Sequence, residues 1–141
     1  MFIGEYHYKV DAKGRLPIPP HFRGELQNGL VLSRGIEQCL VVYSPTEWKN
    51  LASSMATTGS ITPDKMRRLN RYVFATAFSL NIDSQGRIAL PPVLREYADI
   101  GNEVIIAGVN SYLELWNRGI WEEEKARSQE QAWQIIESLE K

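Results

Sequence analysis

A segment of thirteen residues occurs twice in this 141-residue chain, and this repetition limits how the chain can fold. Residues 11–23 (DAKGRLPIPPHFR) recur 72 positions later as residues 83–95 (DSQGRIALPPVLR). Six of the thirteen positions are identical: Asp11/Asp83, Gly14/Gly86, Arg15/Arg87, Pro19/Pro91, Pro20/Pro92 and Arg23/Arg95. The match continues at an offset of 73 through Gly35/Gly108, Leu40/Leu113 and Trp48/Trp121. The chain therefore contains two copies of one structural unit.

The repeat predicts how the chain is divided. We expect a first unit over residues 5–47, a helical linker over 48–76, a second unit over 77–120 and a C-terminal helical tail over 121–141. A unit of this size buries too little surface to be stable by itself, whereas two units can share a core. The expected arrangement is a pseudo-twofold pair inside one compact domain.

Each copy has the same pattern of predicted elements. Residues 6–10 and 78–82 alternate in apolar character, which is typical of a strand; a DxxGR turn follows, and a second strand runs up to the Pro-Pro pair, which predicts a hairpin. Proline suits the first turn of a helix, so short helices are expected over 21–26 and 93–98. A second hairpin joins 30–32 to 40–43, and 104–107 to 113–116. The fold class is α+β, mainly β: a small barrel or sandwich with peripheral helices.

Helices are predicted in the linker and the tail. Residues 44–47 (SPTE) form a capping-box pattern before one helix, and Thr62-Pro63 opens another, on which Lys65, Arg67, Arg68 and Arg71 are either solvated or phosphate-facing. Residues 128–131 (SQEQ) resemble a capping box and predict the start of a final amphipathic helix that carries Ala132, Ile135, Ile136 and Leu139. Trp48 and Trp121 are interpreted as core anchors.

Charge and composition narrow the classes of function. The formal net charge of −1 divides unevenly, because residues 1–100 hold 12 basic and 9 acidic residues, while residues 101–141 hold 4 and 8. An acidic tail can thus hide a basic surface in the total. The apolar runs are far shorter than the roughly 20 residues of a membrane helix, so we expect a cytoplasmic protein without a membrane partner. A single cysteine, Cys39, excludes an internal disulfide and a multi-cysteine metal site, and we expect no metal or cofactor.

The DxxGR turns carry the clearest chemical signal. Asp11 and Asp83 stand where a side chain can accept backbone N–H groups, and Gly14 and Gly86 stand where the backbone can take a positive φ. Turn geometry does not require Arg15 or Arg87. An arginine at this position can form an ion pair with the turn aspartate, and an arginine oriented in this way can also address a phosphate or the O6/N7 edge of guanine.

These residues carry a family resemblance. With its N-terminal GEYHYKVDAKGRLPIP block and a second DxxGR at the right spacing, the chain resembles the MraZ family of bacterial transcriptional regulators over essentially its whole length. That family is built from two tandem SpoVT-AbrB units, so the resemblance implies a swapped-hairpin barrel. It also implies a nucleoid-associated protein that forms a homo-oligomeric ring on double-stranded DNA. Its expected sites are short G-containing direct repeats upstream of the division and cell-wall gene cluster, and its expected targets include its own operon.

The resemblance also assigns candidate site residues. The family's D-x-x-x-R motif falls on Asp11 and Arg15 in the first unit and on Asp83 and Arg87 in the second. Lys13 corresponds to Gln85, and Lys9 corresponds to Asn81, so the first unit has more positive charge for phosphate contacts and the two copies need not bind equally. We expect Arg15 and Arg87 to read bases, with Lys13, Gln85 and Lys9 as further DNA contacts.

Two other classes of function compete with DNA binding. An enzyme would have to rely on His7, His21 or Cys39, or on Asp11 and Asp83 as a carboxylate pair, and no nucleophile or phosphate-binding motif supports it. No small-molecule substrate is therefore expected. The alternative is a protein-interaction module, antitoxin-like or a scaffold, whose C-terminal helix binds a partner.

Overall fold

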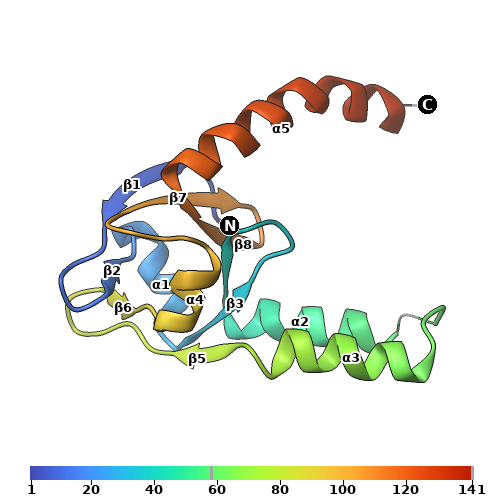
Figure 1. Cartoon of the computed structure of the whole chain (residues 1–141), viewed down its shortest axis with the longest axis horizontal. Helices are drawn as coiled ribbons and strands as arrows, with labels where there is room; N and C mark the ends of the chain where they lie inside the picture. Colours follow the sequence, from blue (N-terminus) through green and yellow to red (C-terminus); the bar gives the residue numbers. More distant parts are fainter. Residues whose placement is uncertain (58, 141) are drawn as a thin grey trace.

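The computed structural model of the protein describes residues 1–57 and 59–140, in which eight strands form a barrel-like core with helices around it (Figure 1). The strands are β1 (Glu5–Lys9), β2 (Arg15–Pro17), β3 (Leu30–Arg34), β4 (Leu40–Tyr43), β5 (Phe78–Leu80), β6 (Arg87–Ala89), β7 (Glu103–Val109) and β8 (Tyr112–Asn117). The helices are the 3-10 turn η1 (Pro20–Phe22) and α1 (Arg23–Leu26), α2 (Pro45–Ala56), α3 (Pro63–Phe74), α4 (Pro92–Tyr97) and α5 (Arg118–Leu139). The predicted α+β class is confirmed.

The larger sheet shows the twofold relation that the repeat predicts. Its strand order is β1-β7-β8-β4-β3-β5, which reads the same in both directions when each strand of one copy is exchanged for its counterpart in the other. The first strand of each copy pairs with the other copy: β1 lies antiparallel to β7, and β5 lies antiparallel to β3. The central pair, β4 and β8, also joins the two copies.

The predicted pairing of each first strand with the second strand of its own copy is wrong. The DxxGR turn does reverse the chain, but β2 leaves the turn to pair with β6 in a separate two-stranded ribbon. The interleaved arrangement is the swapped hairpin that the family resemblance implies. Pairing between copies prevails because it places Leu16 and Ile88, both fully buried, in the common core. The second hairpins, β3–β4 and β7–β8, are confirmed.

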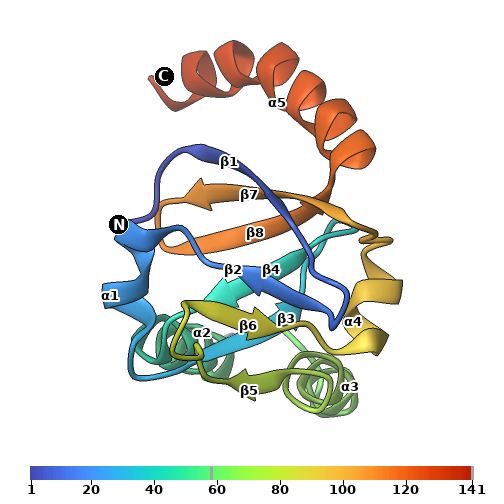
Figure 2. The same ribbon diagram turned by 90° about the vertical axis from the view of Figure 1, so that its left-hand side faces the viewer.

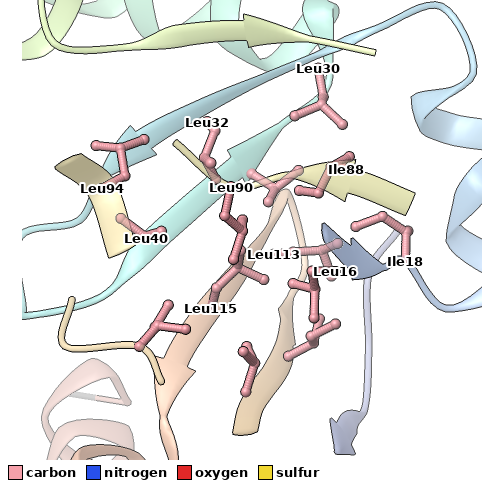
Figure 3. Packing of buried hydrophobic residues seen from close by; sticks show 14 of the residues in the cluster. Leu16, Ile18, Leu30, Leu32, Leu40, Ile88, Leu90, Leu94, Leu113 and Leu115 are labelled. Atoms are coloured by element: carbon pink, nitrogen blue, oxygen red, sulfur yellow. The ribbon is translucent and has the colours of Figure 1, made fainter. Parts of the chain in front are cut away.

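The core is shared by both copies. Figure 3 shows leucine and isoleucine side chains from equivalent positions meeting at the centre, among them the pairs Leu16/Ile88, Ile18/Leu90 and Leu40/Leu113. All six of these side chains have 4% exposure or less. Burying one such side chain contributes about 1.5–3 kcal/mol, so neither copy could keep its core without the other.

The two Pro-Pro segments form short helices as predicted, and a pair of longer helices projects from the barrel (Figure 1). α2 begins after Ser44, whose hydroxyl accepts the Glu47 backbone N–H at 3.2 Å, which confirms this cap. α3 begins after Thr62 as expected. Trp48 packs against Tyr43 and Phe74 and is only half-buried, so it lies at the junction of α2, α3 and the sheet rather than inside the core.

The C-terminal helix begins earlier than predicted. α5 starts at Arg118, where the Asn117 side chain accepts the Ile120 backbone N–H at 3.0 Å, and Ser128 lies inside the helix instead of capping it. An asparagine cap directly after β8 satisfies the first free N–H groups, so no second start is needed. Trp121, half-buried, packs on Trp116 with ring centroids 5.7 Å apart. None of the described helices combines the length and the apolar character that crossing a membrane requires.

Candidate nucleic-acid interface

The ribbon formed by β2 and β6 presents both repeated arginines on one face. Arg15 lies opposite Ala89, Leu16 opposite Ile88 and Pro17 opposite Arg87. Successive side chains of a strand point to opposite faces, so Leu16 and Ile88 enter the core while Arg15 and Arg87 share the outer face. Figure 2 shows this ribbon crossing one side of the barrel, with a DxxGR turn at each end.

The first turn holds Arg15 through Asp11. One carboxylate oxygen, Oδ1, accepts the backbone N–H groups of Lys13 and Arg15, both at 2.9 Å, and the other, Oδ2, accepts Arg15 Nε–H at 2.7 Å. The Gly14 N–H donates to the Asp11 carbonyl at 3.0 Å, and Gly14 has φ +79°, a conformation that favours glycine. The Asp11 carboxylate therefore both closes the turn and orients the Arg15 guanidinium.

The second turn repeats this geometry residue by residue. Asp83 Oδ1 accepts the N–H groups of Gln85 and Arg87 at 2.9 Å, and Oδ2 accepts Arg87 Nε–H at 2.9 Å. Gly86 also has φ +79°. In both turns the backbone N–H of the arginine is the main cause that lowers the pKa of the aspartate, and the guanidinium adds to it. Both carboxylates are consequently ionised at neutral pH.

The two turns meet across the ribbon. Arg87 Nη1 lies 3.9 Å from Asp11 Oδ2, so one carboxylate attracts the arginines of both copies. The side chains of Arg15 and Arg87 are 32% and 23% exposed. Within the described residues, hydrogen bonds occupy only the Nε–H group of each guanidinium. The terminal amino groups can still donate to a phosphate or to a guanine edge.

Arg23 and Arg95 also belong to this region, and sequence reasoning did not include them among the candidate site residues. Each lies over the turn glycine of the other copy: the Arg23 guanidinium covers Gly86, and Arg95 Nη1 would be 3.4 Å from a Cβ at Gly14. Arg23 Nε–H donates to the Ile18 carbonyl at 2.9 Å, and Arg95 Nη2–H donates to the Gly101 carbonyl at 2.9 Å. The sequence did contain a signal for these two residues, because the same arginine occupies the equivalent position in both copies of the repeat.

Comparison with known proteins identifies the same family that the sequence motifs resemble. The family model described as MraZ protein, antitoxin-like, matches residues 1–71 and 73–137. The chain belongs to the MraZ family. It is similar to proteins named transcriptional regulator MraZ from Dehalococcoides mccartyi (55% identical, covering 99% of each chain), Herpetosiphon aurantiacus (46%, covering 86% of this chain and 85% of the relative) and Thermoanaerobacter pseudethanolicus (41%, covering 99% and 97%).

The other three predicted DNA contacts of this MraZ-family chain do not all lie beside the ribbon. Lys13 and Gln85 are exposed at equivalent places in the two turns, beside the ribbon arginines. Lys9 is exposed at the end of β1, where it pairs in register with Glu103 and lines a hollow that also contains Glu122. Lys9 therefore lies outside the ribbon and close to acidic side chains.

A catalytic role finds little support in the MraZ-family chain. His21 Nε2 is held by the Tyr6 hydroxyl at 2.6 Å. Cys39 is fully buried, and burial raises the pKa of its thiol far above the ordinary range, so the sulfur stays protonated. Among the described residues, the group of side chains that could hold a metal is Glu37, Cys39 and Glu114, whose ligand atoms lie within 4.8 Å of one another. The names of the relatives denote transcriptional regulators, which is a non-enzymatic role.

Proposed function

We propose that this chain is a DNA-binding transcriptional regulator that reads DNA with the β2–β6 ribbon. The observation that carries the proposal is the placement of Arg15 and Arg87, each oriented by a turn aspartate, on the outer face of a two-stranded ribbon. The major groove of B-DNA admits a ribbon of this kind, and arginine is the commonest reader of guanine there. Arg15 and Arg87 are the proposed base-reading residues.

The neighbouring residues have supporting parts in the proposal. Lys13 and Gln85 are exposed in the turns, where Lys13 neutralises a phosphate and Gln85 donates a hydrogen bond without charge. The first turn therefore contributes more to salt-dependent binding than the second. Lys9 contributes less than Lys13, because Glu103 lies opposite it in the sheet.

Assembly supplies the affinity that one ribbon lacks. A ribbon makes few contacts with DNA, whereas a homo-oligomeric ring presents many ribbons, and repeats one helical turn apart can engage several together. The proposed sites are short G-containing direct repeats upstream of the division and cell-wall gene cluster, and regulation includes the protein's own operon. Such a protein works at the nucleoid, in the cytoplasm. The family resemblance and the names of the relatives support this proposal.

Fluorescence anisotropy tests the ribbon. Wild type, Arg15→Ala/Arg87→Ala and Lys13→Ala are titrated with DNA that carries G-containing direct repeats and with a scrambled duplex, at several salt concentrations, while particle size is followed. We expect the double arginine variant to lose about 1–3 kcal/mol per base contact and to bind both duplexes alike. Lys13→Ala weakens binding to both duplexes and lowers the salt slope by about one. If the arginine variant keeps its preference for the repeats at unchanged size, the ribbon is not the reader.

A further inference from the structure

The C-terminal half of α5 carries apolar side chains that nothing in the described chain covers. Every residue from 126 to 140 is exposed, including Ile135 at 54%, Ile136 at 44% and Leu139 at 79%. Together with Ala132 they follow i, i+3, i+4, i+7 spacing, so they form one stripe, here called the α5 stripe (Ala132, Ile135, Ile136, Leu139). A row of exposed apolar side chains on one side of a helix is a candidate contact surface.

The α5 stripe continues the side of the helix that already contacts the barrel. In the N-terminal half of α5, Trp121 and Lys125 both donate to Glu5 Oε1, at 3.0 and 2.9 Å. Steps of three and four residues lead from these positions through Ser128 to Ala132. The docked side of the helix therefore extends beyond the end of the barrel, where no other described residue covers it.

A matching face lies on α3. Lys65, Arg68, Leu69 and Tyr72, here called the α3 face, have the same i, i+3, i+4, i+7 spacing, and all four are exposed. Leu69 and Tyr72 are 36% and 44% exposed and lie beside two cations. Neither α2 nor α3 contains a buried residue, so the helix pair has surface left for another partner.

The charges of the two surfaces are opposite. α3 holds four basic residues against Asp64, which gives a formal charge of +3. Residues 128–140 hold Glu130, Glu137 and Glu140 and no basic residue, which gives −3. Electrostatic complementarity of this kind favours association of the two surfaces and fixes their register.

The two surfaces cannot meet within one chain. Figures 1 and 2 place α5 and α3 on opposite sides of the barrel. We propose that the α5 stripe of one copy docks on the α3 face of a second copy, an inference that deepens the homo-oligomer of the proposed function and rests on it. The contact is heterologous, so after one contact the first copy still has a free α3 face and the second still has a free α5 stripe. Repetition of such a contact produces a ring when the rotation closes.

Complementation between two defective variants tests this contact in the full-length protein. The α5 variant is Ile135→Asp/Ile136→Asp, and the α3 variant is Arg68→Glu/Leu69→Asp. Gln134→Asp and Asn70→Asp place one negative charge on other sides of α5 and α3 and are the controls. Sizes come from sedimentation velocity, and circular dichroism melting checks folding, which exposed positions should leave unchanged.

We expect the wild type and both controls to assemble and each variant to be a monomer of 16.1 kDa. An equimolar mixture of the two variants should double this mass, because the intact stripe of one fits the intact face of the other. If only the α5 variant is monomeric and mixing restores nothing, the stripe binds another surface, such as a second α5. A monomeric wild type would overturn this contact and the proposed ring, while the ribbon's DNA binding could still be measured separately.

Discussion

The turn aspartates show how one side chain can organise both a turn of the fold and the candidate binding surface beside it. Asp11 and Asp83 each accept two backbone N–H groups and one guanidinium N–H, so the residue that closes the turn also orients the arginine. The two turns have equal backbone geometry but different surroundings. Arg23 packs directly over Gly86, whereas Arg95 lies further from Gly14. The same substitution should therefore have unequal effects in the two copies.

Gly14→Ala and Gly86→Ala form a matched pair. Each places a Cβ at φ +79°, which costs about 1–2 kcal/mol for an L residue. Gly86→Ala also displaces the Arg23 guanidinium and breaks its hydrogen bond to the Ile18 carbonyl, which adds roughly 1 kcal/mol. Urea unfolding at one fixed protein concentration measures both losses. Equal losses would show that Arg23 does not hold the second turn.

Glu114 gives a pH-dependent prediction. Burial raises the pKa of its carboxyl, and Glu37 and Glu124 add repulsion, so the folded chain binds the proton more tightly than the unfolded chain. The ionised wild type therefore loses stability as pH rises through the window between the ordinary and the raised pKa. Glu114→Gln keeps an oxygen for Trp116 Nε1–H and should be more stable at pH 7, by less than about 1 kcal/mol because solvent screens a partly exposed carboxylate. Thermal melts should show this gain shrinking toward pH 4, and a gain that persists there would contradict the explanation.

Helix ends in this chain depend on single side chains. Ser44 caps α2 through the Glu47 N–H, and Asn117 caps α5 through the Ile120 N–H. Thr62 stands at the corresponding place before α3, but its hydroxyl donates to Asp64 Oδ1 at 2.6 Å instead of accepting an N–H. Two of these helices therefore begin with a side-chain N-cap and α3 does not, although each begins directly after a polar residue.

Ser44→Ala and Thr62→Ala distinguish a helix start that depends on a side-chain N-cap from one that does not. Ser44→Ala removes an N-cap acceptor and should cost about 1 kcal/mol, with faster hydrogen exchange at the Glu47 amide. Thr62→Ala removes no N-cap bond and should cost less, while the pKa of Asp64, now lowered mainly by the Thr62 hydroxyl, moves up toward its ordinary value. Hydrogen exchange and carboxyl titration by NMR measure both effects. The interpretation fails if Thr62→Ala destabilises the chain as much as Ser44→Ala.

In the whole molecule, the proposed DNA-reading surface and the proposed assembly surfaces lie on different sides. The ribbon crosses one side of the barrel, while α2, α3 and the C-terminal half of α5 project from it (Figures 1 and 2). Substitutions in the α5 stripe should therefore leave each ribbon intact. The affinity for a single site and the gain from several sites become separately measurable.

The Ile135→Asp/Ile136→Asp variant should bind DNA with one repeat as the wild type does, within about twofold. On DNA with several repeats it should bind about 10²-fold or more weakly, because only an assembly engages several sites together. Anisotropy titrations on the two duplexes measure both values, with Gln134→Asp as the control. Equal losses on both duplexes would mean that α5 supports the ribbon itself.

The sequence alone determined the local features of this protein. The thirteen-residue repeat predicted two equivalent copies, and the Asp, Gly and Arg of each turn predicted the positive φ and the ion pair, because such turns depend on residues only a few positions apart. The Ser44 cap was predicted for the same reason.

The tertiary structure decided the strand partners and the shared face. Alternation of apolar residues is equally compatible with pairing inside a copy or between copies, and only burial of Leu16 and Ile88 in a common core selects the second. That choice places Arg15 and Arg87 side by side and lays Arg23 and Arg95 across the opposite turns. The tertiary structure also leaves the end of α5 beyond the barrel, where no other described residue covers its apolar side chains.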